Sequence, residues 1–187
     1  MADPLANGLP LGVRCRSLAV FQDGRGALAE VYREEWGVCS APRQWNVVRS
    51  FPGTLRGVHV HNAHVDYLFV ADGHMILGIH DIRDESPTRG LGVLVDLKGD
   101  AFRTIYIPPG VAHGFYFSVP TTYFYALTHH WTTDDELGCG WNDPALGLRW
   151  PMSAPVLSER DKTAGSYQQM VEAFRERKAA AEHAAGT

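Results

Sequence analysis

Residues 54–82 read TLRGVHVHNAHVDYLFVADGHMILGIHDI, and this stretch decides the fold more clearly than any other part of the chain. It divides into three short runs, at 54–61, 65–71 and 74–82, in which Val, Ile, Tyr and Phe are frequent. The turn residues Ala71-Asp72-Gly73 separate the second run from the third. Short runs of this kind, punctuated by turn residues, are typical of strands in an all-β protein.

The same pattern continues on both sides of this stretch. Further strands are expected at 44–50, 91–97, 102–108, 114–119 and 121–131. Turn residues such as Lys98-Gly99-Asp100 and Pro109-Gly110 stand between them. Many short strands at this spacing predict a sandwich or barrel rather than alternating strands and helices.

The C-terminal part of the chain has a different pattern. Tyr167, Met170, Val171 and Phe174 recur at helical spacing, so 166–185 is expected to form one C-terminal helix. Neither an internal repeat nor a low-complexity linker interrupts the chain. We therefore interpret residues 1–187 as a single domain with its core over about 20–165.

Charge and length limit the function classes. A chain of 187 residues is long enough for one domain with a substantial core. Its formal net charge is −4, without the basic surplus that nucleic-acid binding requires. A few arginines in a cleft can still hold a phosphate whatever the net charge, so an anionic small molecule remains a candidate substrate.

Cysteine usage and the N-terminal sequence bear on location. Cys15, Cys39 and Cys139 have neither the number nor the spacing of a disulfide framework or a zinc finger. The start, MADPLANGLPLG, lacks the pattern of a signal peptide, and no apolar run approaches the roughly 18 residues of a membrane span. We expect a cytoplasmic protein that binds neither membrane nor nucleic acid.

Histidines provide the first indication of a site. His59 and His61 are two positions apart in an expected strand, so both side chains leave the same face. His64 and Asp66 follow at once, and His113 comes just after the turn that contains Pro109-Gly110. A lone histidine in a strand is usually structural, but this combination favours a site, with His59, His61 and His113 pointing into the barrel.

Five motifs add a resemblance to a known family. They are TLRGVHVH, DIRDESPTRG, IYIPPGVAHGFYF, WNDPALGLRWP and LSERD. In this order they resemble the dTDP-4-dehydrorhamnose 3,5-epimerase family over about residues 20–165. The resemblance implies a double-stranded β-helix, that is, a cupin or jelly-roll barrel. It also implies a homodimer and a nucleotide-diphosphate 4-keto-6-deoxy sugar as substrate, whose C3, C5 or both are inverted.

The resemblance assigns three catalytic roles. His59 matches the family's base, and Asp161 matches the carboxylate that orients this histidine and raises its basicity. Tyr125 matches the acid on the opposite face of the sugar. Read from the residues alone, Tyr125 is also compatible with a place in the core, and Asp161 with a solvated helix cap, although both alternatives are the less favoured ones.

Further positions match the family's substrate pocket. Three arginines, expected at one end of the barrel mouth, match positions that hold the diphosphate or nucleotide: Arg25, Arg56 and Arg160. Other matches to pocket positions are Glu30, Gln44, Asn46 and His113. A planar guanidinium suits phosphate oxygens, although each arginine taken singly is also compatible with a surface ion pair.

The sequence departs from the family pattern at several pocket positions. Asp66 stands where the family has a lysine near the enolate, and a carboxylate would oppose the developing negative charge. Leu77 replaces a family aspartate, and Trp131 replaces a second tyrosine. We interpret His61, Asp66 and Trp131 as part of an altered substrate pocket.

These departures also permit a metal site. His59, His61, Asp66 and His113 resemble the ligand set of metal-binding cupins, and three imidazoles with a carboxylate suit a divalent transition metal. This interpretation competes with the first, because a metal-bound His59 cannot also be a free base. We favour the epimerase, which needs no cofactor, over a metal-dependent cupin enzyme and over an inactive sugar-nucleotide binding protein.

Overall fold

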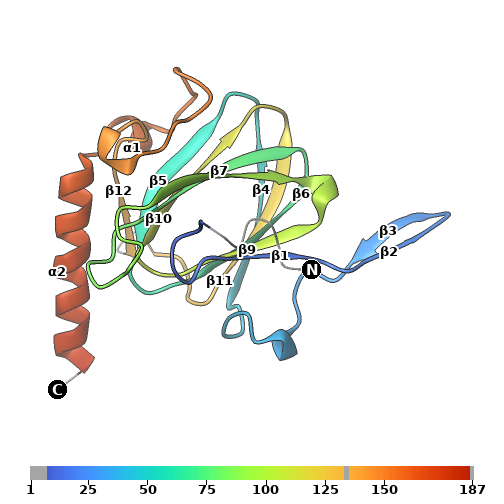
Figure 1. Cartoon of the computed structure of the whole chain (residues 1–187), viewed down its shortest axis with the longest axis horizontal. Coiled ribbons are helices and arrows are strands. Elements are labelled where there is room, and N and C mark those ends of the chain that lie inside the picture. The colour runs from blue at the N-terminus through green and yellow to red at the C-terminus, as the bar shows by residue number, and fades with distance from the viewer. Residues whose placement is uncertain (1–7, 133–134, 186–187) are drawn as a thin grey trace.

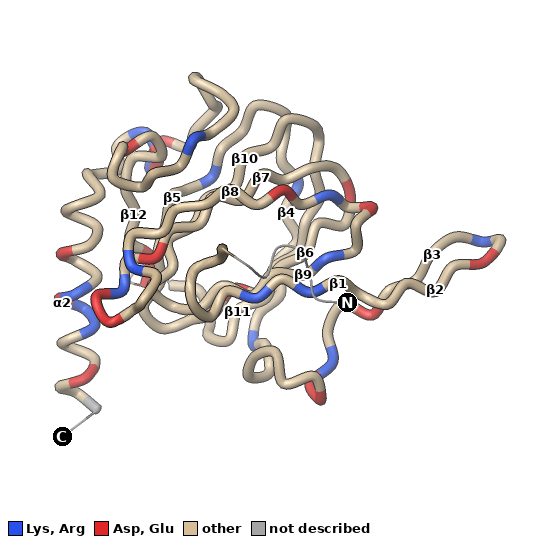
Figure 2. Tube along the Cα trace, viewed as in Figure 1, with Lys and Arg blue, Asp and Glu red and all other residues tan. Residues whose placement is uncertain are grey.

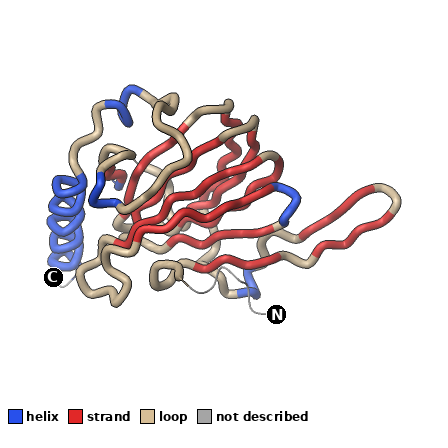
Figure 3. Tube along the Cα trace, turned by 45° about the horizontal axis from the view of Figure 1, so that its top comes forward, coloured by secondary structure: helices blue, strands red, loops and turns tan. Residues whose placement is uncertain are grey.

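The computed structural model describes residues 8–132 and 135–185, which form a barrel of two facing five-stranded antiparallel sheets (Figures 1 and 3). The first sheet has the order β1-β9-β6-β11-β4. Its strands are β1 (Arg14–Ser17), β9 (Arg103–Ile107), β6 (Asp66–Asp72), β11 (Thr121–Leu127) and β4 (Gln44–Ser50). Residues 1–7 and 186–187 of the predicted domain lie outside the described residues.

The second sheet has the order β12-β5-β10-β7-β8. Its strands are β12 (Glu136–Gly138), β5 (Leu55–His61), β10 (Val111–Phe117), β7 (His74–Asp81) and β8 (Gly92–Lys98). Strands β6 and β7, neighbours in sequence, belong to different sheets, so the turn at Gly73 carries the chain from one layer to the other.

The main core fills the space between the two sheets. Leu68 and Ile105 from the first sheet pack with Leu77, Ile79 and Phe117 from the second, and all five are fully buried. Strict alternation along each strand places these side chains on the inner face. The predicted all-β double-stranded β-helix with a C-terminal helix is confirmed.

A second apolar cluster fixes the C-terminal helix. Helix α2 (Tyr167–Ala185) buries Met170, Val171 and Phe174 against Val58 and Val60 of β5. This agrees with the helix predicted at 166–185, and α2 lies along one side of the barrel beside β12 (Figure 1). In the described part of the chain, no helix is long and apolar enough to cross a membrane.

Short helical elements occupy the connections between strands. They are η1 (Glu34–Trp36), η2 (Gly99–Ala101), η4 (Pro144–Leu146) and α1 (Glu159–Lys162). Ser158 caps α1 by accepting a hydrogen bond from the backbone N–H of Asp161. This cap fixes the position from which the Asp161 side chain reaches the barrel.

A two-stranded hairpin projects from the barrel on the side opposite α2 (Figure 1). It consists of β2 (Val20–Asp23) and β3 (Gly26–Ala29), and its exposed apolar side chains include Phe21 and Leu28. Acidic and basic residues occur together at its tip and along α2, with no large region of one sign on the traced chain (Figure 2).

Strand boundaries differ from the prediction where pairing decides them. The strand expected at 121–131 ends at Leu127, because its partners β6 and β4 begin opposite that residue. The strand expected at 114–119 begins already at Val111, which pairs with Asp81. Strands β1 and β12 and the hairpin were not predicted, since runs of three or four residues carry little periodicity.

Candidate functional site

A cavity of about 610 Å³ opens between the two sheets. Nine of the sequence-predicted site residues line it: Arg56, His59, His61, Asp66, His113, Tyr125, Trp131, Arg160 and Asp161. Its size is that of an ordinary small-molecule site. The three histidines that were expected to point into the barrel therefore do so.

Strands β5 and β10 place the central histidines side by side. His59 and His113 are directly paired in the ladder, and His61 follows on the same face as His59. The strands approach closely at Gly57, where φ is 102° and a Cβ atom would lie 2.8 Å from the carbonyl oxygen of His113. A glycine is therefore required at this position of the LRGVH motif.

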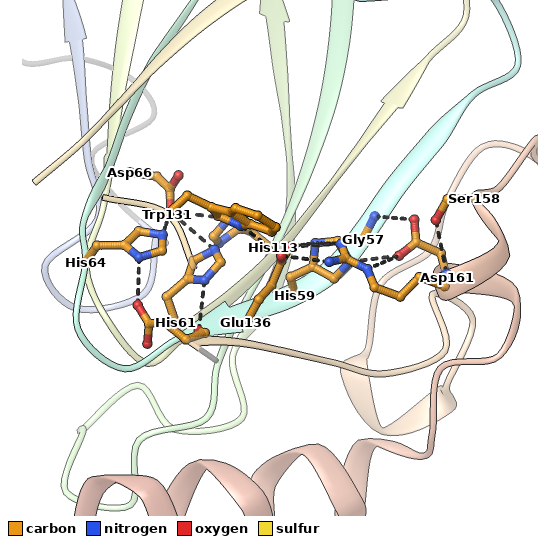
Figure 4. Close-up of polar contacts among 12 residues, drawn as sticks. Gly57, His59, His61, His64, Asp66, His113, Trp131, Glu136, Ser158 and Asp161 are labelled. Atoms are coloured by element: carbon orange, nitrogen blue, oxygen red, sulfur yellow. Dashed lines mark hydrogen bonds and ion pairs between the residues drawn. The ribbon is translucent and has the colours of Figure 1, made fainter. Parts of the chain in front are cut away.

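His59 lies between two carboxylates (Figure 4). Its Nε2 is 2.8 Å from Oδ1 of Asp161, and its Nδ1 is 3.0 Å from Oε1 of Glu136. The other carboxylate oxygen of Asp161 accepts a hydrogen bond from the backbone N–H of Gly57. The predicted pairing of His59 with Asp161 is thus present, and the second carboxylate is an addition that the sequence did not indicate.

The contacts of His59 with Asp161 and Glu136 shift the pKa values of all three groups. Burial on its own would lower the pKa of His59, but hydrogen bonds to Asp161 and Glu136 outweigh burial and raise it. Burial would raise the pKa of Asp161 and of Glu136, yet the hydrogen bonds with His59 bring both below their usual range. Both acids therefore stay ionised around His59.

Glu136 also organises the mouth of the cavity. Its carboxylate accepts two hydrogen bonds from the guanidinium of Arg160, at 2.7 and 2.8 Å, and one from the indole N–H of Trp131 at 2.9 Å. The Arg160 guanidinium also lies 2.9 Å from Nε2 of His59. Glu136 is thus a site residue that the sequence did not reveal, because its place depends on the short strand β12 pairing with β5.

Tyr125 approaches the cavity from the opposite side. It belongs to β11 of the first sheet, whereas His59 belongs to β5 of the second. Both side chains line the same cavity, so they face one another across it. Burial raises the pKa of the Tyr125 phenol, which keeps its proton in place at neutral pH.

Gln44 and Asn46 lie beside the cavity and are not part of its lining. The Gln44 amide donates to Asn46 and accepts from the backbone N–H of Trp131. Asn46 is the ladder partner of Tyr125, and its amide nitrogen is buried without a hydrogen-bond partner. These two residues therefore support the side of the cavity that carries Tyr125 and Trp131.

Arg25 and Glu30 lie away from the cavity within this chain. Arg25 is at the tip of the projecting hairpin, with its guanidinium paired to Asp23 and largely exposed. Glu30 follows β3 and contacts Arg33. Of the three arginines expected at the barrel mouth, only Arg56 and Arg160 are there, because the chain between β1 and β4 leaves the barrel to form the hairpin.

A second cluster of polar groups occupies the inner end of the cavity. His61, His64, Asp66 and His113 are all at least 93% buried, and the rings of His61 and His64 stack with centroids 3.9 Å apart. Burial lowers the pKa of His61 to about 4 and also lowers that of His113. For His64, burial acts in the same direction, but the hydrogen bond to Asp135 raises its pKa above the usual value.

The cluster differs from the ligand set inferred from the sequence. His61, Asp66 and His113 offer ligand atoms that lie within 4.8 Å of one another. His59 turns instead to Asp161 and Glu136, and in the part of the chain that the structure describes it joins no group of possible ligands. His64, which did not belong to the expected set, lies beside this group with its Nε2 3.8 Å from Oδ2 of Asp66, and it forms a second group of possible ligands with His61 and Asp135.

Comparison with known proteins identifies the family of this chain. The dTDP-4-dehydrorhamnose 3,5-epimerase family matches residues 11–169. The chain belongs to the dTDP-4-dehydrorhamnose 3,5-epimerase family. The predicted family and the predicted isomerase activity, that of a nucleotide-sugar epimerase, are confirmed.

Individual relatives match over most of their length. The chain is 36% identical to a dTDP-4-dehydrorhamnose 3,5-epimerase of Salmonella typhimurium over 155 residues, which are 78% of this chain and 85% of the relative. It is 30% identical over 143 residues to the spore coat polysaccharide biosynthesis protein SpsL of Bacillus subtilis, covering 74% of this chain and 95% of SpsL.

Solved structures show the same fold with ligands. An epimerase of Legionella pneumophila in complex with dTDP-4-keto-L-rhamnose superposes with a TM-score of 0.80 at 29% identity, over 87% of this chain and 92% of that one. The epimerase of Bacillus anthracis with TDP and pyrophosphate bound gives 0.78 at 31% identity, over 82% and 93%.

Proposed function

We propose that this chain epimerises a nucleotide-diphosphate 4-keto-6-deoxy sugar at C3, C5 or both, with His59 as base and Tyr125 as acid. The observation that carries the proposal is that His59, held by Asp161, and Tyr125 line one cavity from facing sheets. Inversion of a carbon requires that a proton leave one face of the sugar ring and return to the other.

The chemistry follows from the ketone. The C4 carbonyl acidifies the C–H bonds at C3 and C5, so His59 can take a proton and leave an enolate. Tyr125 then gives its phenolic proton to the opposite face of the same carbon. The imidazolium passes its proton to solvent, and solvent reprotonates the tyrosine, so atoms and charge balance over one turnover.

Asp161 and Glu136 act on the base differently. Asp161 holds Nε2 and accepts from the backbone of Gly57, so it fixes the ring and leaves Nδ1 as the nitrogen that takes the proton. Nδ1 faces Glu136 at 3.0 Å. A substrate must therefore replace Glu136 at this nitrogen before the ring can act as a base.

Arg56 and Arg160 are the proposed diphosphate ligands. Among the described residues they are the Lys or Arg side chains that line the cavity. Arg160 is bound to Glu136, and phosphate oxygens would compete for the same guanidinium. The ligands named for the Legionella and Bacillus anthracis structures make dTDP sugars the first substrates to test.

The projecting hairpin supports a homodimer. Arg25 and Glu30 cannot serve the cavity of their own chain in this structure, and exposed Phe21 and Leu28 on the hairpin suit burial against a second copy. Strand β1 already pairs with β9, so β2 and β3 are the N-terminal strands available for this contact. We propose a cytoplasmic homodimer, and light scattering at micromolar concentration tests the dimer.

The test of the proposed function is exchange of solvent deuterium into dTDP-4-keto-6-deoxyglucose, followed by NMR. Wild-type protein should incorporate deuterium at C3, C5 or both, and His59→Asn should abolish it. The exposed His130 provides a matched control, so His130→Asn should exchange at the wild-type rate. Wild-type exchange rates in His59→Asn would exclude His59 as the base.

A further inference from the structure

Three imidazole rings converge on one carboxylate at the inner end of the cavity. Nε2 of His61 and Nε2 of His113 each lie 3.6 Å from Oδ2 of Asp66, and Nε2 of His64 lies 3.8 Å from the same atom (Figure 4). The residues come from β5, β6, β10 and the turn before β6. The sequence therefore brings four potential ligands to one point from separate parts of the chain.

The outer nitrogen of each ring is already used. Nδ1 of His113 donates to the backbone carbonyl of Val111 at 3.1 Å, and Nδ1 of His61 donates to the carbonyl of Asp135 at 3.3 Å. Nδ1 of His64 donates to the side chain of Asp135 at 2.7 Å. Oxygen acceptors at every Nδ1 place a proton on that nitrogen, so Nε2 is the nitrogen of each ring whose lone pair is left to bind a cation at the centre.

The space between the three rings and Asp66 consequently contains hydrogen-bond acceptors without a matching donor. With the proton of each ring on Nδ1, the Nε2 lone pairs and Oδ2 of Asp66 are all acceptors, and separations of 3.6–3.8 Å are too long for hydrogen bonds between them. Nε2 of His64 is buried and has no hydrogen-bond partner. Buried acceptors that face one another are costly unless a cation lies between them.

We propose that His61, His64, Asp66 and His113 form a binding site for one divalent transition-metal ion. Imidazole and carboxylate ligands suit Zn²⁺, Fe²⁺, Co²⁺ or Mn²⁺, and oxygen acceptors behind each ring are the usual support of histidine ligands. Ligand atoms about 2.1 Å from a tetrahedral ion lie about 3.4 Å apart. The three separations between a histidine Nε2 and Oδ2 of Asp66 need to shorten by only a few tenths of an ångström. His61, Asp66 and His113 already offer atoms within 4.8 Å of one another, and the His64 ring has to move closer to His113 to complete the set.

This site leaves His59 free for catalysis. The set inferred from the sequence included His59, which removed the base whenever metal was bound. With His64 as the fourth ligand, His59 stays with Asp161 and Glu136. All four proposed ligands line the cavity, so an open coordination position of the ion would face it.

The test is titration of chelator-treated protein with Zn²⁺ by calorimetry, and with Co²⁺ by visible absorption. Wild-type protein should bind one ion of each per chain, and Co²⁺ should give the intense visible bands of a site of low coordination number. His64→Gln and Asp66→Asn should each weaken Zn²⁺ binding at least about 100-fold, since loss of a supporting group alone costs about 10–100-fold.

Two control variants separate this ligand set from others. His59→Gln should keep the wild-type affinity within a few-fold, whereas the set that includes His59 requires a large loss. His130→Gln removes an exposed histidine and should also bind normally. Circular dichroism checks that each variant is folded. Absence of stoichiometric binding by wild-type protein, or equal affinity of folded His64→Gln and wild type, would overturn the proposal.

Discussion

Nε2 of His59 lies 2.8 Å from Oδ1 of Asp161, although the two residues are 102 positions apart in the chain. The contact exists because α1, capped by Ser158, places Asp161 over the start of β5. Only 7% of the Asp161 surface is exposed, so solvent contributes little to orienting the imidazole. The carboxylate therefore fixes which ring nitrogen is available in the cavity.

Asp161→Asn should slow deuterium exchange into the substrate by about 10²–10⁴-fold without abolishing it. The amide keeps the shape of the side chain but loses the charge that stabilises the imidazolium, while His59 itself remains able to take a proton. Asp143→Asn serves as a control on the same measurement, since Asp143 caps η4 outside the cavity. Equal exchange rates in Asp161→Asn and wild type would contradict the role assigned to Asp161.

Tyr125→Phe should separate exchange from inversion. His59 still removes and returns a proton on its own face, so deuterium should continue to enter, but net inversion should fall by about 10²–10⁴-fold. NMR of the sugar ring measures both quantities in one sample. Tyr116→Phe is the control, because Tyr116 lies in β10 and does not line the cavity. Parallel loss of exchange and inversion would show that Tyr125 is not a separate acid.

Much of the fold could be predicted from the sequence because strand periodicity is a local property. Runs such as 44–50 and 74–82 alternate or stay apolar within themselves, and they form β4 and β7 almost as expected. The strands of three or four residues could not be found this way. Their pairing partners are distant in sequence: β1 pairs with β9, and β12 with β5.

The candidate site was predictable where a residue sits within a regular strand. His59 and His61 share a face because of the two-residue period, and the structure keeps them together. His64 follows the turn after β5, so alternation says nothing about its direction. Glu136 stands in a sequence of threonines and acids typical of an exposed loop, and only its pairing with β5 makes it part of the cavity.

Asp81 should make the free energy of unfolding depend on pH in the acidic range. Its side chain is fully buried, and although burial would raise its pKa, hydrogen bonds from Arg83, Ser86 and Thr88 lower it from 3.8 to about 2. The unfolded chain therefore binds more protons between pH 4 and pH 2. This group's contribution, about 2 kcal/mol, is present above about pH 4 and is lost as pH falls through 2.

Urea unfolding at several pH values measures this contribution. The difference in stability between wild type and Asp81→Asn should shrink by about 2 kcal/mol between pH 5 and pH 2. The exposed Asp100 gives the matched control, and Asp100→Asn should follow wild type at every pH. A constant difference between wild type and Asp81→Asn would mean that the buried carboxylate is not the acid-sensitive group.

Arg160 and Glu136 should have opposite effects on nucleotide binding. The guanidinium of Arg160 donates to both oxygens of Glu136, at 2.7 and 2.8 Å, so a diphosphate has to compete with this carboxylate. Arg160→Ala should weaken binding of dTDP by about 1.5–3 kcal/mol, the value of a charge-assisted contact. Glu136→Gln should tighten dTDP binding by up to about tenfold, because a buried like charge near the phosphate is removed and Arg160 is released.

Calorimetry with dTDP measures both variants, and Arg49→Ala, on the outer face of β4, should leave the affinity unchanged. Weaker binding by Glu136→Gln would show that Glu136 positions Arg160 for the phosphate instead of competing with it.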